Sequence, residues 1–232
     1  MKGNQMNKLI RFFQQSRDRL ESEGATSFLA NPAGPPRADY PPGARAVIIT
    51  IDVSPSMEQD DYHPTRLEGA KRAVQRYLGI MSRQEPETLI GIVDFHGEAE
   101  LVTHPLPIGN HHRQLLEFLM RLHTGSCTNI GAALQLSGRE LARIHSPRNP
   151  EVILLTDGDS NQGPDPVTAA EELKARGIQL DIIGIGGSPA EVNERDLKRM
   201  ASVRNGQLRY WFIESADALI KQFEALALRE ID

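Results

Sequence analysis

The chain has 232 residues, of which 39% are hydrophobic and 25% charged, a balance typical of a globular protein with a buried core. Its net charge of −5 and the lack of a basic stripe argue against binding to nucleic acid. A single cysteine, Cys127, excludes an intrachain disulfide and favours a reducing compartment. No run approaches the ~20 apolar residues that span a bilayer, and residues 1–20 lack the apolar stretch of a signal peptide. We therefore expect a cytoplasmic protein with no membrane partner.

Residues 1–44 are expected to form a helix and a proline-rich connector ahead of the main domain. An amphipathic helix is predicted over residues 5–23, because apolar side chains recur there with helical spacing. They are Met6, Leu9, Ile10 and Phe13. Residues 31–43 contain five prolines and two glycines, which predicts an irregular, fairly stiff connector. The helix fits either packing on its own domain or binding a partner, and both hypotheses stay open.

The rest of the chain, residues 45–232, is expected to form one domain in which strands alternate with helices. Runs of apolar β-forming residues predict strands over residues 47–51, 89–95, 99–103, 152–155, 178–185 and 207–213. Helical patterns lie between and after them, over residues 65–82, 111–122, 129–144, 165–176, 191–202 and 216–230. This alternation predicts an α/β fold: a doubly wound, mostly parallel six-stranded sheet with helices on both faces.

Oxygen-bearing side chains follow two of these strands and precede one of the helices. Asp52, Ser54 and Ser56 come directly after the first strand, and Asp157 after the fourth, while Thr128 lies before the helix at 129–144. Ligands of such sheets bind beyond the carboxyl ends of the strands, so these residues are expected to meet at one edge. An all-oxygen set suits a hard divalent cation, with Mg²⁺ as the first candidate and Mn²⁺ or Ca²⁺ as alternatives.

The composition of this set indicates a docking point more than a closed cage. Two carboxylates and three neutral hydroxyls leave Mg²⁺ under-neutralised, so that it would bind a further anionic oxygen from outside this set. The competing interpretation is that these side chains are strand-end caps and turn residues, roles in which Asp and Ser are common.

The pattern Asp52-x-Ser54-x-Ser56, Thr128 and Asp157-Gly158 resembles the metal-ion-dependent adhesion site (MIDAS) of von Willebrand factor A (VWA) domains, which include integrin I domains. The resemblance extends over residues 45–230 and implies a Rossmann-like sheet whose short third strand is antiparallel at one edge. It also implies that the two serines and the threonine bind the ion directly, and that the carboxylates act partly through water. An Asp or Glu of a partner protein would complete the coordination.

The resemblance further implies a non-enzymatic module of the bacterial, intracellular, single-domain type. Such members act as adaptors beside ATPases, chelatases or kinase–phosphatase pairs, which makes an AAA-type ATPase a candidate partner. One departure is that Ser126 and Cys127 precede Thr128, where many members carry glycines, so we expect a less mobile loop. Because free cysteines are commonly buried, Cys127 is expected to be buried and inert.

Two enzymatic hypotheses compete with the binding module. A Mg²⁺-dependent phosphatase or phosphotransferase of the haloacid dehalogenase type also places an Asp after the first strand. Its pattern is Asp-x-Asp, and in this chain Ser54 stands at the position of the second Asp. A hydrolase using Ser54 or Ser56 as the nucleophile lacks a Gly-x-Ser-x-Gly motif. The polar residues after the fourth strand, Asp159, Asn161 and Asp165, are expected to form a solvated turn more than contacts that support the metal-binding residues or a second ion site.

Overall fold

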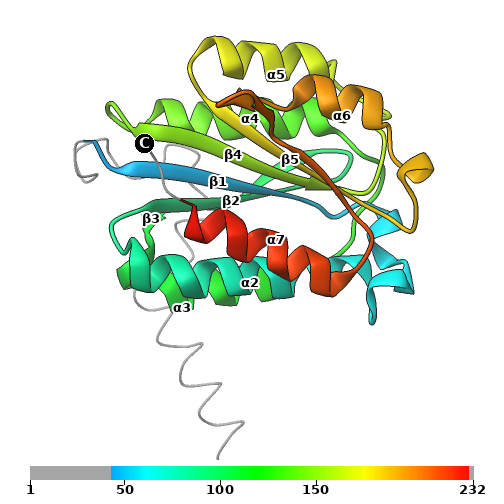
Figure 1. Ribbon diagram of the computed structural model, residues 1–232, viewed down its shortest axis with the longest axis horizontal. Helices are drawn as coiled ribbons and strands as arrows, with labels where there is room; N and C mark the ends of the chain where they lie inside the picture. Colours follow the sequence, from blue (N-terminus) through cyan, green and yellow to red (C-terminus); the bar gives the residue numbers. More distant parts are fainter. Residues whose placement is uncertain (1–42, 230–232) are drawn as a thin grey trace, which may run out of the picture. The chain divides into compact units, whose positions relative to one another are not determined.

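The computed structural model of the chain describes residues 43–229 (Figure 1). The helix predicted at 5–23 and nearly all of the connector at 31–43 lie outside the described residues, so the proposed division at residue 44 stays a prediction. The described part has the expected α/β fold, a six-stranded sheet with helices on both faces. No helix within residues 43–229 is long and apolar enough to cross a membrane.

The sheet has the strand order β3-β2-β1-β4-β5-β8. Its strands are β1 (Arg45–Asp52), β2 (Leu89–Phe95), β3 (Ala99–Pro107), β4 (Arg148–Thr156), β5 (Gln179–Ile185) and β8 (Tyr210–Ile213). All neighbours are parallel except β2 and β3, so the fold class predicted from the sequence is confirmed. In the centre, β1 lies beside β4 with Ile51 opposite Leu155. The polar residues that follow these two strands therefore leave the sheet at the same edge.

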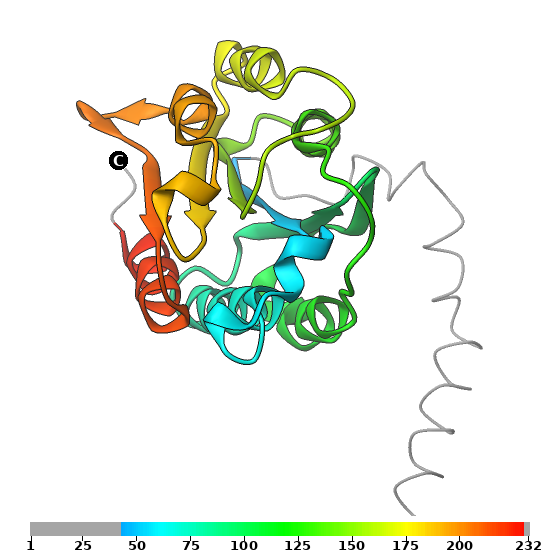
Figure 2. The same cartoon turned by 90° about the vertical axis from the view of Figure 1, so that its right-hand side faces the viewer.

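Helices cover both faces of the sheet, as Figures 1 and 2 show. One layer consists of α2 (Arg66–Gln84), α3 (Ile108–Met120) and α7 (Ala216–Leu228), and the other of α4 (Ile130–Ala142), α5 (Pro166–Ala175) and α6 (Glu194–Met200). Residues of β1 alternate between two hydrophobic cores: Val47 and Ile49 belong to the α2 side, and Ala46 and Ile48 to the α4 side. Burial on both faces explains why the strand is an unbroken apolar run in the sequence.

The edges of the sheet differ from the sequence prediction. The antiparallel edge strand β3 continues to Pro107, beyond the expected end at residue 103. The predicted strand at 207–213 is divided, because β6 (Val203–Arg204) and β7 (Gln207–Leu208) form a separate small hairpin before β8 begins. Its turn residues Asn205 and Gly206 have φ of 50° and 75°. An Asn-Gly pair with positive φ favours a tight hairpin turn, and this local signal accounts for the split.

Candidate metal centre

Four of the five predicted metal-binding residues form one hydrogen-bonded chain at the carboxyl ends of β1 and β4. The backbone N–H of Ser54 donates to Oδ1 of Asp52 over 2.8 Å. The hydroxyl oxygens of Ser54 and Ser56 lie 3.1 Å apart. Ser56 Oγ in turn donates to Oδ1 of Asp157 over 2.7 Å. The structure thus brings together oxygen atoms from two strand ends that are far apart in the sequence.

The fifth residue, Thr128, lies on a loop that is tied to both of these strand ends. The N–H of Gly125 in this loop donates to the carbonyl of Val53 over 2.7 Å. The N–H of Thr128 donates to Asn161 Oδ1 over 3.1 Å, and the N–H of Asn161 donates back to the Thr128 carbonyl over 3.0 Å. Within residues 43–229 the hydroxyl of Thr128 makes no hydrogen bond, although the residue is buried. This oxygen is therefore free to accept an external ligand.

The two carboxylates are buried close to each other. Burial, together with the negative charge of Asp157, raises the pKa of Asp52 to about 7. Burial also raises the pKa of Asp157, while hydrogen bonds from Ser56 and Arg66 oppose the rise. A cation between the two groups would relieve this cost, since an opposite charge favours the ionised form of a carboxyl. The electrostatics of the two carboxylates therefore fit a bound cation.

The donor set also restricts the kind of ion. Among residues 43–229, no group of three or more His, Cys, Asp or Glu side chains is placed to hold a metal ion. An ion at this edge would therefore depend on the hydroxyls of Ser54, Ser56 and Thr128 as well as on the two carboxylates. Hard oxygen ligands of this kind fit Mg²⁺, Mn²⁺ or Ca²⁺.

Sequence reasoning missed two side chains that hold the carboxylates in place. Thr156, the last residue of β4, donates from Oγ1 to Oδ2 of Asp52 over 2.6 Å. Arg66, in the first turn of α2, donates from Nη1 to Oδ2 of Asp157 over 3.1 Å. A cation at the amino end of a helix is opposed by the helix dipole. Arg66 directly follows the cap residue Thr65. An arginine at this unfavourable position was the sequence signal that its side chain pairs with acidic groups.

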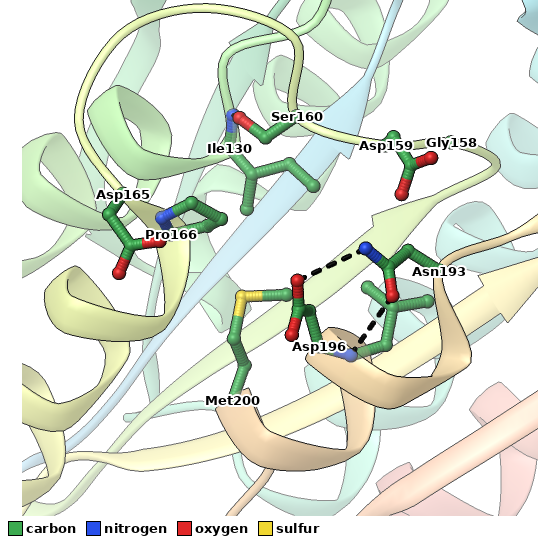
Figure 3. A pocket seen from close by; sticks show the side chains of 10 residues that line it. Ile130, Gly158, Asp159, Ser160, Asp165, Pro166, Asn193, Asp196 and Met200 are labelled. Atoms are coloured by element: carbon green, nitrogen blue, oxygen red, sulfur yellow. Dashed lines mark hydrogen bonds between the residues drawn. The ribbon is translucent and has the colours of Figure 1, made fainter.

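The loop after Asp157 is more than a solvated turn. Asn161 supports the Thr128 loop through the two hydrogen bonds described above. Asp165 caps α5, because its Oδ2 accepts a hydrogen bond from the N–H of Thr168 over 2.7 Å. Asp159 is exposed and lines a small cavity of about 130 Å³ beside the site, which is drawn in Figure 3.

This cavity lies between the loop after β4 and α6. Its wall includes Gly158, the residue after Asp157, so it adjoins the candidate metal centre. In Figure 3, Asn193 and Asp196 bond to each other across the start of α6, with Asn193 Nδ2 donating to Asp196 Oδ2 over 3.0 Å. The side chains of Asp165 and Asn193 thus cap α5 and α6, the Asp196 carboxylate holds Asn193 in place, and the cavity contributes polar surface next to the site.

Cys127 is exposed, so the expectation of a buried cysteine is wrong. Its backbone has φ of 55°, in the left-handed region that favours glycine. The loop turns sharply here to place Thr128 against Asn161, and this turn directs the cysteine side chain outward. Glycine, the residue expected from the family resemblance at this point of the loop, would adopt the same conformation with less strain.

Comparisons with known proteins support the fold and the family. Residues 47–160 match the family model described as von Willebrand factor type A domain. A UPF0353 protein of Mycolicibacterium paratuberculosis is 28% identical over 181 residues, covering 72% of this chain and 53% of that protein. A 26S proteasome non-ATPase regulatory subunit 4 homolog of Oryza sativa is 27% identical over 154 residues, covering 65% of this chain and 37% of that protein. The chain thus spans about half the length, or less, of these two relatives.

Solved structures share the fold at low sequence identity. The conserved hypothetical protein BatB from Bacteroides thetaiotaomicron superposes with a TM-score of 0.64 at 22% identity, over 81% of this chain and 100% of that chain. The SpRpn10 VWA domain gives a TM-score of 0.63 at 18% identity, over 77% of this chain and 95% of that chain. Proximal thread matrix protein 1 from the mussel byssus, with a zinc-occupied MIDAS motif, gives 0.62 at 20% identity, over 82% of this chain and 48% of that chain. The match over residues 47–160 places this part of the chain in the von Willebrand factor type A domain family, and the solved structures share its fold.

Proposed function

We propose that this chain is a non-enzymatic interaction module that binds the acidic residue of a partner protein through a Mg²⁺ ion. The observation that carries the proposal is the hydrogen-bonded chain from Asp52 through Ser54 and Ser56 to Asp157. Together with the free hydroxyl of Thr128, it gathers two buried carboxylates and three hydroxyls at one edge of the sheet. VWA domains are typically interaction modules, and this set supports the metal-dependent form of that role.

The three hydroxyls and the two carboxylates would hold the ion, and the ion would supply an open position for one further anionic oxygen. Mn²⁺ and Ca²⁺ fit the same ligands. The mussel protein with its zinc-occupied MIDAS motif supports a metal at this place in the fold.

We propose that the partner belongs to a larger assembly. The likeness to a homolog of a 26S proteasome regulatory subunit supports an adaptor role of this kind. An AAA-type ATPase, a chelatase or a kinase–phosphatase pair remains the candidate class of partner, and nucleic acid and membranes are not expected ones. The single cysteine supports a reducing compartment such as the cytoplasm.

The phosphatase hypothesis gains nothing from the geometry of the site. Its mechanism needs a second acid two positions after the first Asp. That position holds Ser54, whose hydroxyl lies against Ser56. Turnover of a panel of phosphate esters with Mg²⁺, lost on Asp52→Asn, would revive the hypothesis.

Two measurements test the proposed function. Isothermal titration with Mg²⁺ should show binding to the wild type and binding weaker by about tenfold or more in Asp52→Ala and Thr128→Ala. Pull-down with and without EDTA, followed by mass spectrometry, should show a partner that needs the metal and both residues. Asp159→Ala is the matched control, because this exposed carboxylate lies in the same region but outside the hydrogen-bonded chain. Capture that is insensitive to EDTA and to both substitutions would contradict the proposal.

A further inference from the structure

The guanidinium of Arg66 is buried among three carboxylates, one of which belongs to the candidate metal centre. The side chain is only 2% exposed. Its Nη1 bonds to Asp157 over 3.1 Å, and its Nη2 bonds to Asp61 over 2.6 Å and to Glu191 over 2.7 Å. These acids come from three different segments, the loop after β1, the end of β4 and the loop after β5. One buried cation therefore joins three loops at the edge where the ion is expected.

The bond to Arg66 also determines how Asp157 is presented. Oδ2 of Asp157 is taken by the guanidinium, while Oδ1 accepts the hydrogen bond from Ser56. With its two oxygens held by different partners, the carboxylate has one defined orientation. Arg66 therefore leaves a single oxygen of Asp157 on the side of the serines, where a metal ion would lie.

The same contact brings a permanent positive charge next to the position where the ion is expected. An arginine stays protonated at all relevant pH values, and two positive charges in a buried setting repel each other more strongly than in water. Asp61 and Glu191 offset part of this charge, but they are 31% and 42% exposed, so solvent screens them. Orientation by Arg66 favours metal binding, whereas its charge opposes it.

We propose that Arg66 is a positioning residue that acts through Asp157 and that its charge keeps the intrinsic affinity of the site for divalent cations low. The proposal rests on the proposed metal site. Its consequence is that a metal ion alone binds weakly and that an acidic group from a partner supplies the missing negative charge. Binding of the metal ion and binding of the partner are thereby coupled, so that each raises the affinity of the protein for the other.

The test is isothermal titration of Mg²⁺ into the wild type and Arg66→Met. Removing the positive charge should tighten Mg²⁺ binding by about tenfold or more, because charge repulsion outweighs the lost orientation at a buried site. Arg66→Lys keeps the charge and should bind Mg²⁺ within about threefold of the wild type. If Arg66 had only a structural role, both variants would bind Mg²⁺ more weakly. Tighter binding in Arg66→Met therefore distinguishes an effect of the charge from a structural role.

Arg76→Met is the matched control on the same helix. Arg76 is 54% exposed and pairs with Glu224, so its replacement should leave Mg²⁺ affinity unchanged. Melting curves in EDTA and in Mg²⁺ give a second readout. Arg66→Met should melt below the wild type without metal, because Asp157 loses its partner, and should gain more from Mg²⁺.

A second variant covers the case in which Arg66→Met does not fold. Glu191→Gln removes a partly exposed partner of Arg66 and leaves its charge less neutralised, so Mg²⁺ should bind about threefold more weakly. Either of two results would contradict the proposed role of Arg66 and leave the proposed metal site intact. One is an unchanged Mg²⁺ affinity in Glu191→Gln. The other is a folded Arg66→Met that binds Mg²⁺ no more tightly than the wild type. If neither the wild type nor any variant binds a divalent ion, the proposed metal site itself is wrong.

Discussion

Ser56 donates a hydrogen bond to Asp157 across 101 positions of sequence. The contact forms because β1 and β4 are parallel neighbours, so the segments that follow them leave the same edge of the sheet. This bond joins the Asp-x-Ser-x-Ser loop to the second carboxylate. Substitutions at this edge are therefore expected to change metal binding, whereas substitutions at the opposite edge should change stability alone.

Asp52→Asn should remove a pH-dependent loss of stability in the metal-free protein. Burial and the charge of Asp157 raise the pKa of Asp52 to about 7, above its ordinary value of 3.8. Between these values the folded state holds a proton that the unfolded state has released, so stability falls as the pH rises through this window. Urea unfolding in EDTA near pH 5 and pH 8 should show the wild type losing at least about 1 kcal/mol more than the variant. Equal losses in the two proteins would contradict the assignment to Asp52.

The hydroxyl of Thr128 should be needed for metal binding, and its methyl group should not. Thr128→Val keeps the shape of the side chain but removes the oxygen, and Mg²⁺ affinity should fall by about tenfold. Thr128→Ser keeps the oxygen and should bind Mg²⁺ like the wild type. Calorimetry on both variants checks this, and equal binding by the valine and serine variants would exclude Thr128 as a ligand.

Gly131 and Gly158 offer a matched pair of glycines near the site. A Cβ at Gly131 would collide with the carbonyl oxygen of Pro164, whereas a Cβ at Gly158 meets nothing within 4 Å. Gly131→Ala should therefore lower the free energy of unfolding by about 1–3 kcal/mol, and Gly158→Ala should change it little. Because Gly131 lies close to Thr128 in the chain, Gly131→Ala should also weaken Mg²⁺ binding. Urea unfolding and calorimetry on the two alanine variants provide the comparison.

Asp181 should be essential for stability and irrelevant to the metal. Its carboxylate is fully buried, pairs with Arg209 over 2.8 Å and also contacts Arg229, which follows α7. Asp181→Asn would remove the carboxylate that pairs with Arg209 and one of the two that pair with Arg229, the other being Glu151, and should cost about 3 kcal/mol or more in urea unfolding. Glu171→Gln, at an exposed pair with Lys174, should cost close to nothing. A change in Mg²⁺ affinity in Asp181→Asn would show that the two edges are coupled.

The sequence by itself determined the order of the strands along the chain and the residues that follow them. Unbroken apolar runs such as that of β1 arise because both faces of the strand are buried, so burial on both faces can be recognised in the sequence. Topology rules then predicted that Asp52 and Asp157 meet at one edge, and the structure places them in one hydrogen-bonded chain. Their role as metal ligands stays a prediction.

Only the tertiary structure decided which side chains hold this edge together. The pairing of Arg66 with Asp157 spans 91 positions, and that of Asn161 with Thr128 spans 33. Neither follows from periodicity, because the path of the backbone brings these partners together and a repeating pattern does not record it. The same reason explains Cys127, whose positive φ turns it outward although cysteines are commonly buried. Local patterns predicted the central strands and the polar residues that follow them, while the bounds of the edge strands and the contacts between distant segments depended on the folded chain.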